Sequence, residues 1–220
     1  MASCQQCFSE NRQSDREREL RQSSIRQAVG VPDNPNANRR RLERLLDIER
    51  DRYRHMAMHD NLTALANREH FEQVLIKAVS DSATTTGKVA LLYIDLNDFK
   101  PLNDRFGHDL GDEVLRIVGA RMRSVVRASD TVARLGGDEF AVLMGSVTDT
   151  SSLQRTAELI HAQVCRPMHV KEHLVSVSLC VGICIFPDQA SSAEALWIGA
   201  DRAMYAAKRA GKPWHWQGDA

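Results

Sequence analysis

The chain has 220 residues, enough to bury one good hydrophobic core with some sequence left over. Its 29 basic side chains balance its 29 acidic ones, so no net field favours nucleic acid or an anionic membrane, and any anion binding must be local. The first residues lack the pattern of a secretory signal, and no stretch approaches the ~18 apolar residues of a membrane span, so we expect a cytoplasmic protein without a membrane segment.

Five cysteines are present, and three of them lie in apolar surroundings that suit reduced, buried thiols: Cys165, Cys180 and Cys184. The other two, Cys4 and Cys7, form a lone CxxC with no second pair. Solvated thiols on a tail are favoured there over zinc binding or redox use.

Residues 1–37 are polar and are interrupted by glycine and prolines between Gly30 and Pro35. This composition predicts a flexible segment with at most a frayed helix around Arg16 to Val29. Over residues 38–58 the apolar side chains return at alternating four- and three-residue spacing, with Glu49 interrupting the series Leu42, Leu46, Tyr53 and Met56. The spacing predicts a linker helix, which is either a short coiled-coil seam or an amphipathic helix lying against its own domain.

A turn at His59 to Arg68 leads into a helix whose apolar residues fall on one face: Phe71, Val74, Leu75, Ala78 and Val79. After a polar loop from Asp81 to Gly87, the continuous apolar run from Val89 to Ile94 predicts a central strand buried on both faces. This strand is expected to end at Asp95. A buried strand that ends in an aspartate places the carboxylate at a sheet edge where ligands bind.

The segment from Asp95 to Glu113 is dense in polar side chains that offer little packing, as is typical of a binding segment. A helix follows, with Val114, Leu115, Val118, Met122 and Val125 directed inward. Beyond the hairpin described next, we expect a helix over Leu153 to Val164, a long strand region over Leu174 to Phe186, a helix from Ala193 to Arg209 ending near Gly211, and a short strand at Trp214 to Trp216.

The stretch from Arg134 to Phe140 contains two glycines between strand-like flanks, which indicates a β-hairpin. Glycines accept the backbone angles of a tight turn and let an anion approach the main chain. The adjacent carboxylates of Asp138 and Glu139 must stay hydrated or find a cation, and a metal is the natural partner. Taken alone, Gly-Gly-Asp-Glu-Phe is also compatible with an ordinary exposed turn.

The order of elements favours an α/β (α+β) fold with a central, mostly antiparallel sheet covered by helices, and ferredoxin-like topology is the leading candidate. If the strands that carry Asp95 and Asp138 are neighbours, their carboxylates converge on one edge. Two carboxylates beside backbone carbonyls form a hard oxygen site suited to Mg²⁺ or Mn²⁺ bridged to substrate phosphates.

The chain resembles the GGDEF family of diguanylate cyclases in several ordered blocks between His59 and Lys212. The matching blocks are His59 to Thr63 with Asn67 and Arg68, Ile94 to Lys100, Asn103 to His108 with Gly111 and Asp112, Gly136 to Phe140, and Ala200 to Tyr205 with Lys208. The resemblance implies a catalytic domain over 59–217, similar to nucleotidyl cyclases and polymerase palms. It also implies condensation of two GTP into cyclic di-GMP and two pyrophosphates by a homodimer, because one half-site per chain requires two chains facing each other.

By this resemblance, Asp95, the Leu96 carbonyl and Asp138 would hold the metal ions. Glu139 would add to metal binding or accept the hydroxyl proton, the alternative being a solvated glutamate at a turn. Asp138 and Glu139 would form the catalytic set together with Lys100.

The same resemblance implies which residues would bind GTP. Phe99 and Lys100 fall in the family's phosphate loop, and Lys208 and Lys212 would contact the triphosphate from the C-terminal helix. At Lys212 the family often has arginine, so the charge is kept but the bidentate fork is lost. At Asn97 the family commonly has aspartate, which leaves a carboxylate role there in doubt.

Asn103 and Asp112 match the family's guanine readers. An aspartate can accept hydrogen bonds from guanine N1–H and the 2-amino group, which adenine cannot supply, so GTP should be preferred over ATP. The structural alternative for Asp112 is a helix N-cap, and the two roles are compatible. Asp60 and Arg68 are expected to form a structural ion pair.

Arg127 to Asp130 is an RxxD motif, and five residues separate it from Gly136, as in the family's inhibitory product site. Arginine can fork onto guanine or a phosphate, and Asp130 can accept from the guanine edge. The ordinary alternative is a surface ion pair. For the whole chain, the alternative to an active cyclase is a catalytically silent GGDEF domain that binds GTP or cyclic di-GMP as a regulator.

Overall fold

The computed structural model describes residues 35–85 and 87–218, in two compact units that divide after Arg54. The Cys4 and Cys7 pair and the frayed helix expected around Arg16 to Val29 lie outside the described residues.

The predicted linker helix is present as α2 (Pro35–Met58). Its described large apolar side chains are exposed: Leu42, Leu45, Leu46, Ile48 and Met56. Two ion pairs run along the helix, between Arg39 and Glu43 at 2.8 Å and between Arg50 and Asp47 at 3.2 Å. Pairs at this spacing support an isolated helix by only a few tenths of a kcal/mol each, about 0.2–0.5. The exposed apolar side chains are therefore the feature of α2 that a partner could use.

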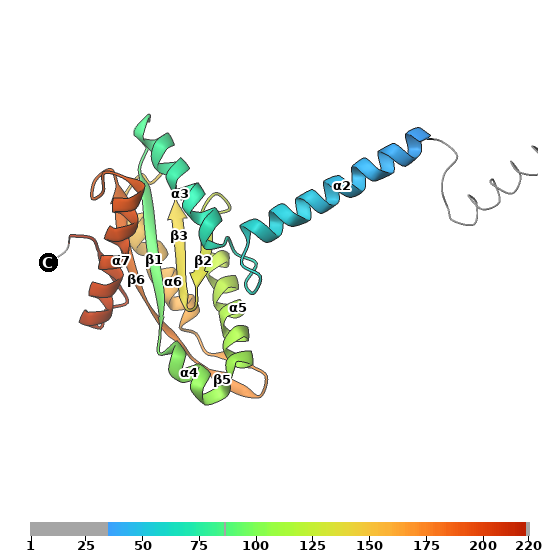
Figure 1. Ribbon diagram of the computed structural model, residues 1–220. Coiled ribbons are helices and arrows are strands. Elements are labelled where there is room, and N and C mark those ends of the chain that lie inside the picture. The colour runs from blue at the N-terminus through green and yellow to red at the C-terminus, as the bar shows by residue number, and fades with distance from the viewer. Residues whose placement is uncertain (1–34, 86, 219–220) are drawn as a thin grey trace, which may run out of the picture. The chain divides into compact units, whose positions relative to one another are not determined.

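The second unit is built on a five-stranded sheet in the order β2-β3-β1-β6-β7 (Figure 1). The strands are β1 (Val89–Asn97), β2 (Thr131–Gly136), β3 (Glu139–Met144), β6 (Ser178–Phe186) and β7 (Trp214–Trp216). Every neighbouring pair is antiparallel except β6 and β7. The predicted mostly antiparallel sheet is confirmed, with the ferredoxin-like order in β2-β3-β1-β6 and β7 as an added edge.

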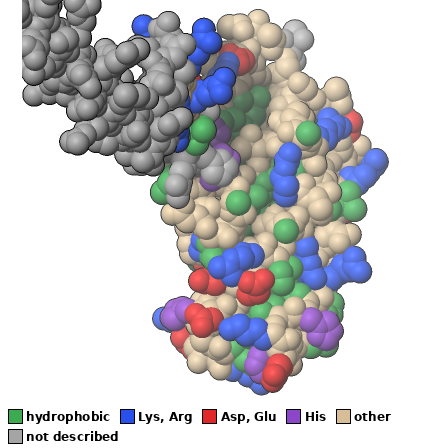
Figure 2. Space-filling model, turned by 90° about the vertical axis from the view of Figure 1, so that its right-hand side faces the viewer, with side chains coloured by type: hydrophobic (Ala, Val, Ile, Leu, Met, Phe, Trp, Pro, Cys, Tyr) green, Lys and Arg blue, Asp and Glu red, His purple; other side chains and the backbone are tan. Residues whose placement is uncertain are grey.

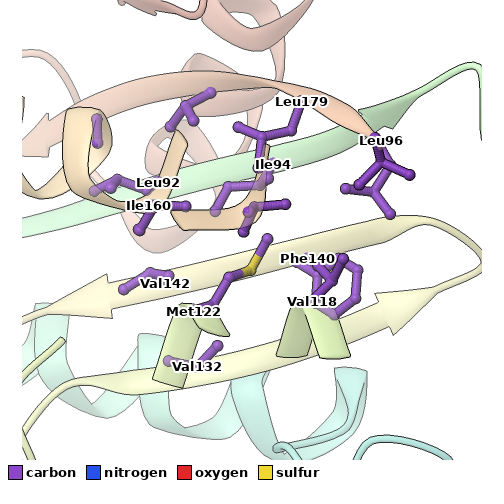
Figure 3. Close-up of a cluster of buried hydrophobic side chains, with 14 of the residues drawn as sticks. Leu92, Ile94, Leu96, Val118, Met122, Val132, Phe140, Val142, Ile160 and Leu179 are labelled. Carbon is purple, nitrogen blue, oxygen red and sulfur yellow. The ribbon is translucent and has the colours of Figure 1, made fainter. Parts of the chain in front are cut away.

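Helices cover both faces of the sheet, which is why the central strand is apolar without alternation. The helices α3 (Arg68–Ala83) and α7 (Ala193–Ala210) pack on the face that carries Leu91 and Tyr93. The helices α5 (His108–Val125) and α6 (Thr150–Val164) pack on the opposite face, around the core shown in Figure 3. A short helix α4 (Phe99–Phe106) and a hairpin of β4 (Met168–Val170) and β5 (His173–Val175) complete the unit.

Four expectations are corrected at element ends. Strand β1 does not end at Asp95 but continues to Asn97, because it pairs with β6 as far as Ser178. The loop expected from Asp81 begins only after Ala83, where α3 ends. Helix α4 and the start of α5 occupy most of the segment from Asp95 to Glu113, where polar binding residues but no helix were expected. The strand region expected from Leu174 is divided into β5 and β6.

The described residues contain no helix that is both long enough and apolar enough to cross a membrane. Cys180 and Cys184 are buried as expected, whereas Cys165 is partly exposed. Burial raises the pKa of the Cys184 thiol to about 11, so this group stays protonated at neutral pH. Basic and acidic side chains are interspersed over the face shown in Figure 2, in keeping with the balanced composition.

Candidate functional site

The acidic residues of the central strands meet at one edge of the sheet. β1 and β3 are neighbours, and Asp95 lies directly opposite Glu139 in their register. The backbone N–H of Leu96 donates to the carbonyl of Asp138 at 3.2 Å, which brings the turn of the hairpin beside the end of β1. The sheet thus brings Asp95 and Leu96 close to Asp138 and Glu139, although the two pairs are at least 42 positions apart in the sequence.

This edge offers oxygen ligands from the side chains of Asp95, Asp138 and Glu139 and from backbone carbonyls. Among the described residues, no group of three or more acidic, histidine or cysteine side chains gathers closely enough to hold a metal by itself. Mg²⁺ commonly binds through one or two carboxylates and completes its shell with water and substrate phosphates. The Lys208 ammonium lies 2.5 Å from Asp95 Oδ1, so a cation is already accommodated here. The donor set therefore fits Mg²⁺ or Mn²⁺ held jointly with a nucleotide.

The two candidate phosphate-binding lysines lie at the C-terminal end of α7 (Ala193–Ala210). Lys208 lies in its last turn, and the hydrogen bond to Asp95 raises the pKa of this lysine above its ordinary value, with a further contribution from the charge of Asp138. The helix ends at Gly211, whose left-handed conformation closes it as predicted. Lys212 follows directly and is exposed.

The glycine turn is held by an arginine for which the sequence suggested no role. Arg134 donates to the Gly137 carbonyl through Nε and Nη2, at 3.0 and 2.9 Å, and its Nη1 lies 3.2 Å from both oxygens of Asp60. Asp60 also accepts from the backbone N–H and the hydroxyl of Thr63. The expected ion pair of Asp60 with Arg68 is therefore wrong, because Asp60 pairs with Arg134 instead.

Arg68 instead forms an ion pair with Glu139. Its Nη2 lies 3.7 Å from Glu139 Oε2, its Nε donates to the Leu135 carbonyl at 3.1 Å, and its guanidinium lies 5.6 Å from the centre of the Trp197 ring. The Glu139 carboxylate also acts on Tyr93, because burial first and the charge of Glu139 second raise the pKa of this tyrosine. Glu139 thus has an ion-pair partner, Arg68 of α3, and is not simply solvated.

The phosphate-loop candidates lie where β1 turns into α4. Asp98 adopts a left-handed conformation with φ of 56°, which is uncommon for a residue with a side chain and is typical of functional turns. Phe99 and Lys100 are the first two residues of α4, so their backbone N–H groups belong to the helix N-terminus, where anions bind. Phe99 is buried, whereas Lys100 is exposed to solvent.

The guanine-reading candidates meet where α4 approaches α5. Asn103 Oδ1 is buried and has no hydrogen-bond partner among the described residues. It lies so near Gly111 that a Cβ there would come within 1.8 Å of it. Asp112 follows Gly111 and is exposed; it is the fifth residue of α5, so the N-cap alternative is wrong. An unpaired buried polar atom costs about 1–3 kcal/mol, so the Asn103 oxygen is a candidate to accept a hydrogen bond from a ligand.

The RxxD motif forms a turn after α5. The Asp130 side chain is buried and accepts from the backbone N–H of Arg127 at 3.0 Å, while the Arg127 side chain is exposed. Arg123 braces the same turn by donating to the carbonyls of Arg127, Ala128 and Asp130. The turn is thus kept in shape by main-chain contacts, which leaves the Arg127 guanidinium available to a ligand.

Asp60→Asn is expected to destabilise the second unit by about 1–2 kcal/mol at pH 7, because it removes the charged partner of Arg134. Burial alone would raise the pKa of Asp60, but the hydrogen bonds from Thr63 and the charge of Arg134 outweigh it and hold the pKa below 3.8. The stabilisation is therefore fully present above about pH 4 and is lost as the pH falls through the lowered pKa. Urea unfolding of parent and variant should show a difference in stability that narrows on acidification, and a constant difference would contradict this.

The second unit is similar to a known family of protein domains. Residues 57–213 match the family model described as diguanylate cyclase, GGDEF domain. Diguanylate cyclase TpbB of Pseudomonas aeruginosa is 44% identical over 156 residues, which are 70% of this chain and 36% of TpbB. The chain thus spans about a third of the length of that curated relative.

Two solved structures extend the comparison. The solved GGDEF domain of TpbB is 42% identical with a TM-score of 0.70, and the match covers 72% of this chain and 94% of that one. The coiled coil and GGDEF domain of DgcB from Caulobacter crescentus, solved in complex with cyclic di-GMP, is 27% identical with a TM-score of 0.75, covering 83% and 95%. Because the family model spans well over half of its residues, the chain belongs to the family of diguanylate cyclase GGDEF domains.

Proposed function

We propose that this chain is an active diguanylate cyclase domain that condenses two GTP into cyclic di-GMP and two pyrophosphates. The observation that carries the proposal is the acidic edge, where Asp95 and Glu139 lie opposite each other and the main chain of Asp138 bonds to Leu96. The unpaired amide oxygen of Asn103 supports a purine site nearby. We assign residues 59–217 to catalysis and 38–58 to the linker.

In the proposed reaction the 3′-oxygen of one GTP attacks the α-phosphorus of the other. A new phosphorus–oxygen bond forms, the bond to the leaving oxygen breaks, and pyrophosphate departs with the electron pair. Glu139 is the candidate to receive the hydroxyl proton. Asp95, Asp138 and the Leu96 carbonyl would hold a divalent ion, which when bound polarises the α-phosphate and offsets charge on the leaving group. The step occurs twice to close the ring.

Binding of GTP is assigned to groups on either side of the acidic edge. The backbone N–H groups of Phe99 and Lys100 at the start of α4, with the charges of Lys100, Lys208 and Lys212, would meet the triphosphate. Asn103 and Asp112 would bind the guanine edge, so that ATP, which lacks the N1–H and 2-amino donors, is rejected.

The reaction requires two chains, and the exposed apolar side chains of α2 support association through that helix. Burying Leu42, Leu46 and Met56 against a second copy would stabilise the dimer by about 25 cal/mol for each Å² of apolar surface removed from water. Dimerisation through α2 would also let a signal received elsewhere set the distance between the two half-sites.

The test is to incubate the purified protein with GTP and Mg²⁺ at several protein concentrations and to separate the nucleotides by chromatography. Cyclic di-GMP should form, at a rate per chain that falls on dilution below the dimer dissociation constant. If no product forms after bound cyclic di-GMP has been removed and dimers have been verified, the chain is the catalytically silent regulator. A rate per chain that is independent of dilution would remove the dimer requirement.

Arg127→Ala is expected to raise the cyclic di-GMP concentration that half-inhibits the enzyme by about tenfold or more, because a bidentate arginine contact is lost. The turn should persist, since Asp130 and Arg123 hold it through the main chain. Initial rates are measured at increasing product concentration, with Arg155→Ala, an exposed arginine of α6, as the control. Equal product sensitivity of the parent and Arg127→Ala would show that this turn is not the inhibitory site.

A further inference from the structure

The carboxylate of Asp95 is already paired with a cation that belongs to the chain. Its side chain is only 16% exposed, and the Lys208 ammonium lies 2.5 Å from its Oδ1 atom. A carboxylate this far buried is unfavourable without a partner, so the lysine stabilises the acidic edge in the nucleotide-free protein. This ammonium lies at the edge to which the proposed function assigns a divalent ion.

Two rigid elements bring the pair together from positions 113 residues apart. Asp95 lies near the end of the central strand, and Lys208 lies in the last turn of α7, which packs closely on the same face. At Gly182 of β6, a Cβ would come within 2.0 Å of the Ala200 carbonyl and 2.1 Å of the Met204 amide, so α7 has no room to move toward the sheet. The lysine stem, by contrast, is flexible and leaves its head 45% exposed.

A divalent ion and this ammonium cannot occupy the same side of Asp95 without strong repulsion. The lysine must therefore leave the carboxylate when a metal ion arrives. An incoming triphosphate offers the displaced ammonium new anionic partners, which are absent when the metal arrives alone.

We propose that Lys208 is a built-in counter-ion that occupies the cation position beside Asp95 and exchanges onto the triphosphate when metal and nucleotide bind together. The inference rests on the proposed function, since it takes the metal and GTP sites from it. It makes metal and nucleotide binding cooperative: each improves the affinity for the other by the same factor. Free metal ions then bind weakly, so the cation position beside Asp95 stays occupied by the Lys208 ammonium until GTP is present.

The test measures binding of Mn²⁺ alone, by the electron paramagnetic resonance signal of free Mn²⁺, in the parent and in Lys208→Met. Removal of the competing charge should tighten Mn²⁺ binding without nucleotide about tenfold or more. The same variant should bind Mn²⁺ with a non-hydrolysable GTP analogue more weakly than the parent, because the triphosphate loses a charge partner. These opposite changes separate counter-ion exchange from a simple phosphate contact and from unfolding, which would weaken both.

Lys212→Met is the matched control, because Lys212 is also proposed to meet the triphosphate, whereas within the described part of the chain it is Lys208 and not Lys212 that forms the ion pair with Asp95. It should weaken binding of the nucleotide without tightening binding of Mn²⁺ alone. Lys208→Arg keeps the charge and should bind Mn²⁺ alone no more tightly than the parent.

The inference would be overturned if Lys208→Met bound Mn²⁺ alone no more tightly than the parent. It would also be overturned if Lys208→Met and Lys212→Met showed the same increase in affinity for Mn²⁺ alone. Because the readout is metal binding without turnover, this failure is distinct from failure of the proposed function, which is tested by formation of cyclic di-GMP.

Discussion

Asp138→Ala is expected to lower the rate of cyclic di-GMP formation at least about a thousandfold, because it removes one of the carboxylates that would hold the divalent ion at the reacting phosphate. The fold should survive the substitution. The backbone carbonyl of Asp138 still accepts from Leu96, and Arg134 still holds the carbonyl of Gly137. The loss should therefore appear in the turnover rate and not in the yield of folded protein.

The measurement compares product formation with saturating GTP and Mg²⁺, and thermal unfolding of both proteins checks the fold. Glu158→Ala is the matched control: Glu158 is an exposed acid of α6, the helix that covers the face of the sheet opposite Asp95. The control should retain the parental rate. If Asp138→Ala also retains it, catalysis does not depend on this carboxylate and the assignment of the acidic edge is wrong.

Gly182→Ala is expected to destabilise the second unit by about 3 kcal/mol or more, since the added methyl has no space. A Cβ at this position would lie 2.0 Å from the Ala200 carbonyl and 2.1 Å from the Met204 amide, and these are backbone atoms of α7 that cannot rotate away. The helix would have to move off β6, taking Lys208 away from Asp95. A loss of this size lowers the melting temperature of a domain this long by about 6–12 °C.

Gly145→Ala is the control for the glycine itself. A Cβ at Gly145 meets nothing within 4 Å, so alanine there should change stability by only about 1 kcal/mol or less. Thermal and urea unfolding of the two variants and the parent provide the comparison. Similar stabilities of Gly182→Ala and Gly145→Ala would mean that α7 can shift at little cost, contrary to the close packing described above.

Most of the element order, and the family, could be predicted from the amino-acid sequence. Apolar residues at helical spacing predicted α3, the alanine-rich α7 and its end at Gly211, and the continuous apolar run predicted the central strand. These features follow from local periodicity and turn chemistry, which a short window of sequence contains. The ordered motifs likewise identified a family that the comparisons confirm.

Local signals were weaker at the ends of elements. α5 begins at His108, just after Gly107, whose φ of 85° and lack of a side-chain cap leave no ordinary start signal. The N-cap role considered for Asp112 was therefore wrong. β1 runs past Asp95 because its pairing with β6 continues, and such pairing depends on a strand more than 80 residues away.

The pairing of polar groups could not be predicted from the sequence and follows from the packing of the elements. Asp60 pairs with Arg134, at a separation of 74 residues, rather than with the nearby Arg68, which reaches Glu139 instead. Asp95 binds Lys208 across 113 residues. The physical reason is that a hydrogen bond or ion pair requires atoms to meet within about 3–4 Å, and that distance is set by how helices pack on the sheet. Hydrophobic periodicity determines which face of an element is buried, but it does not determine which charged side chains meet at the edge.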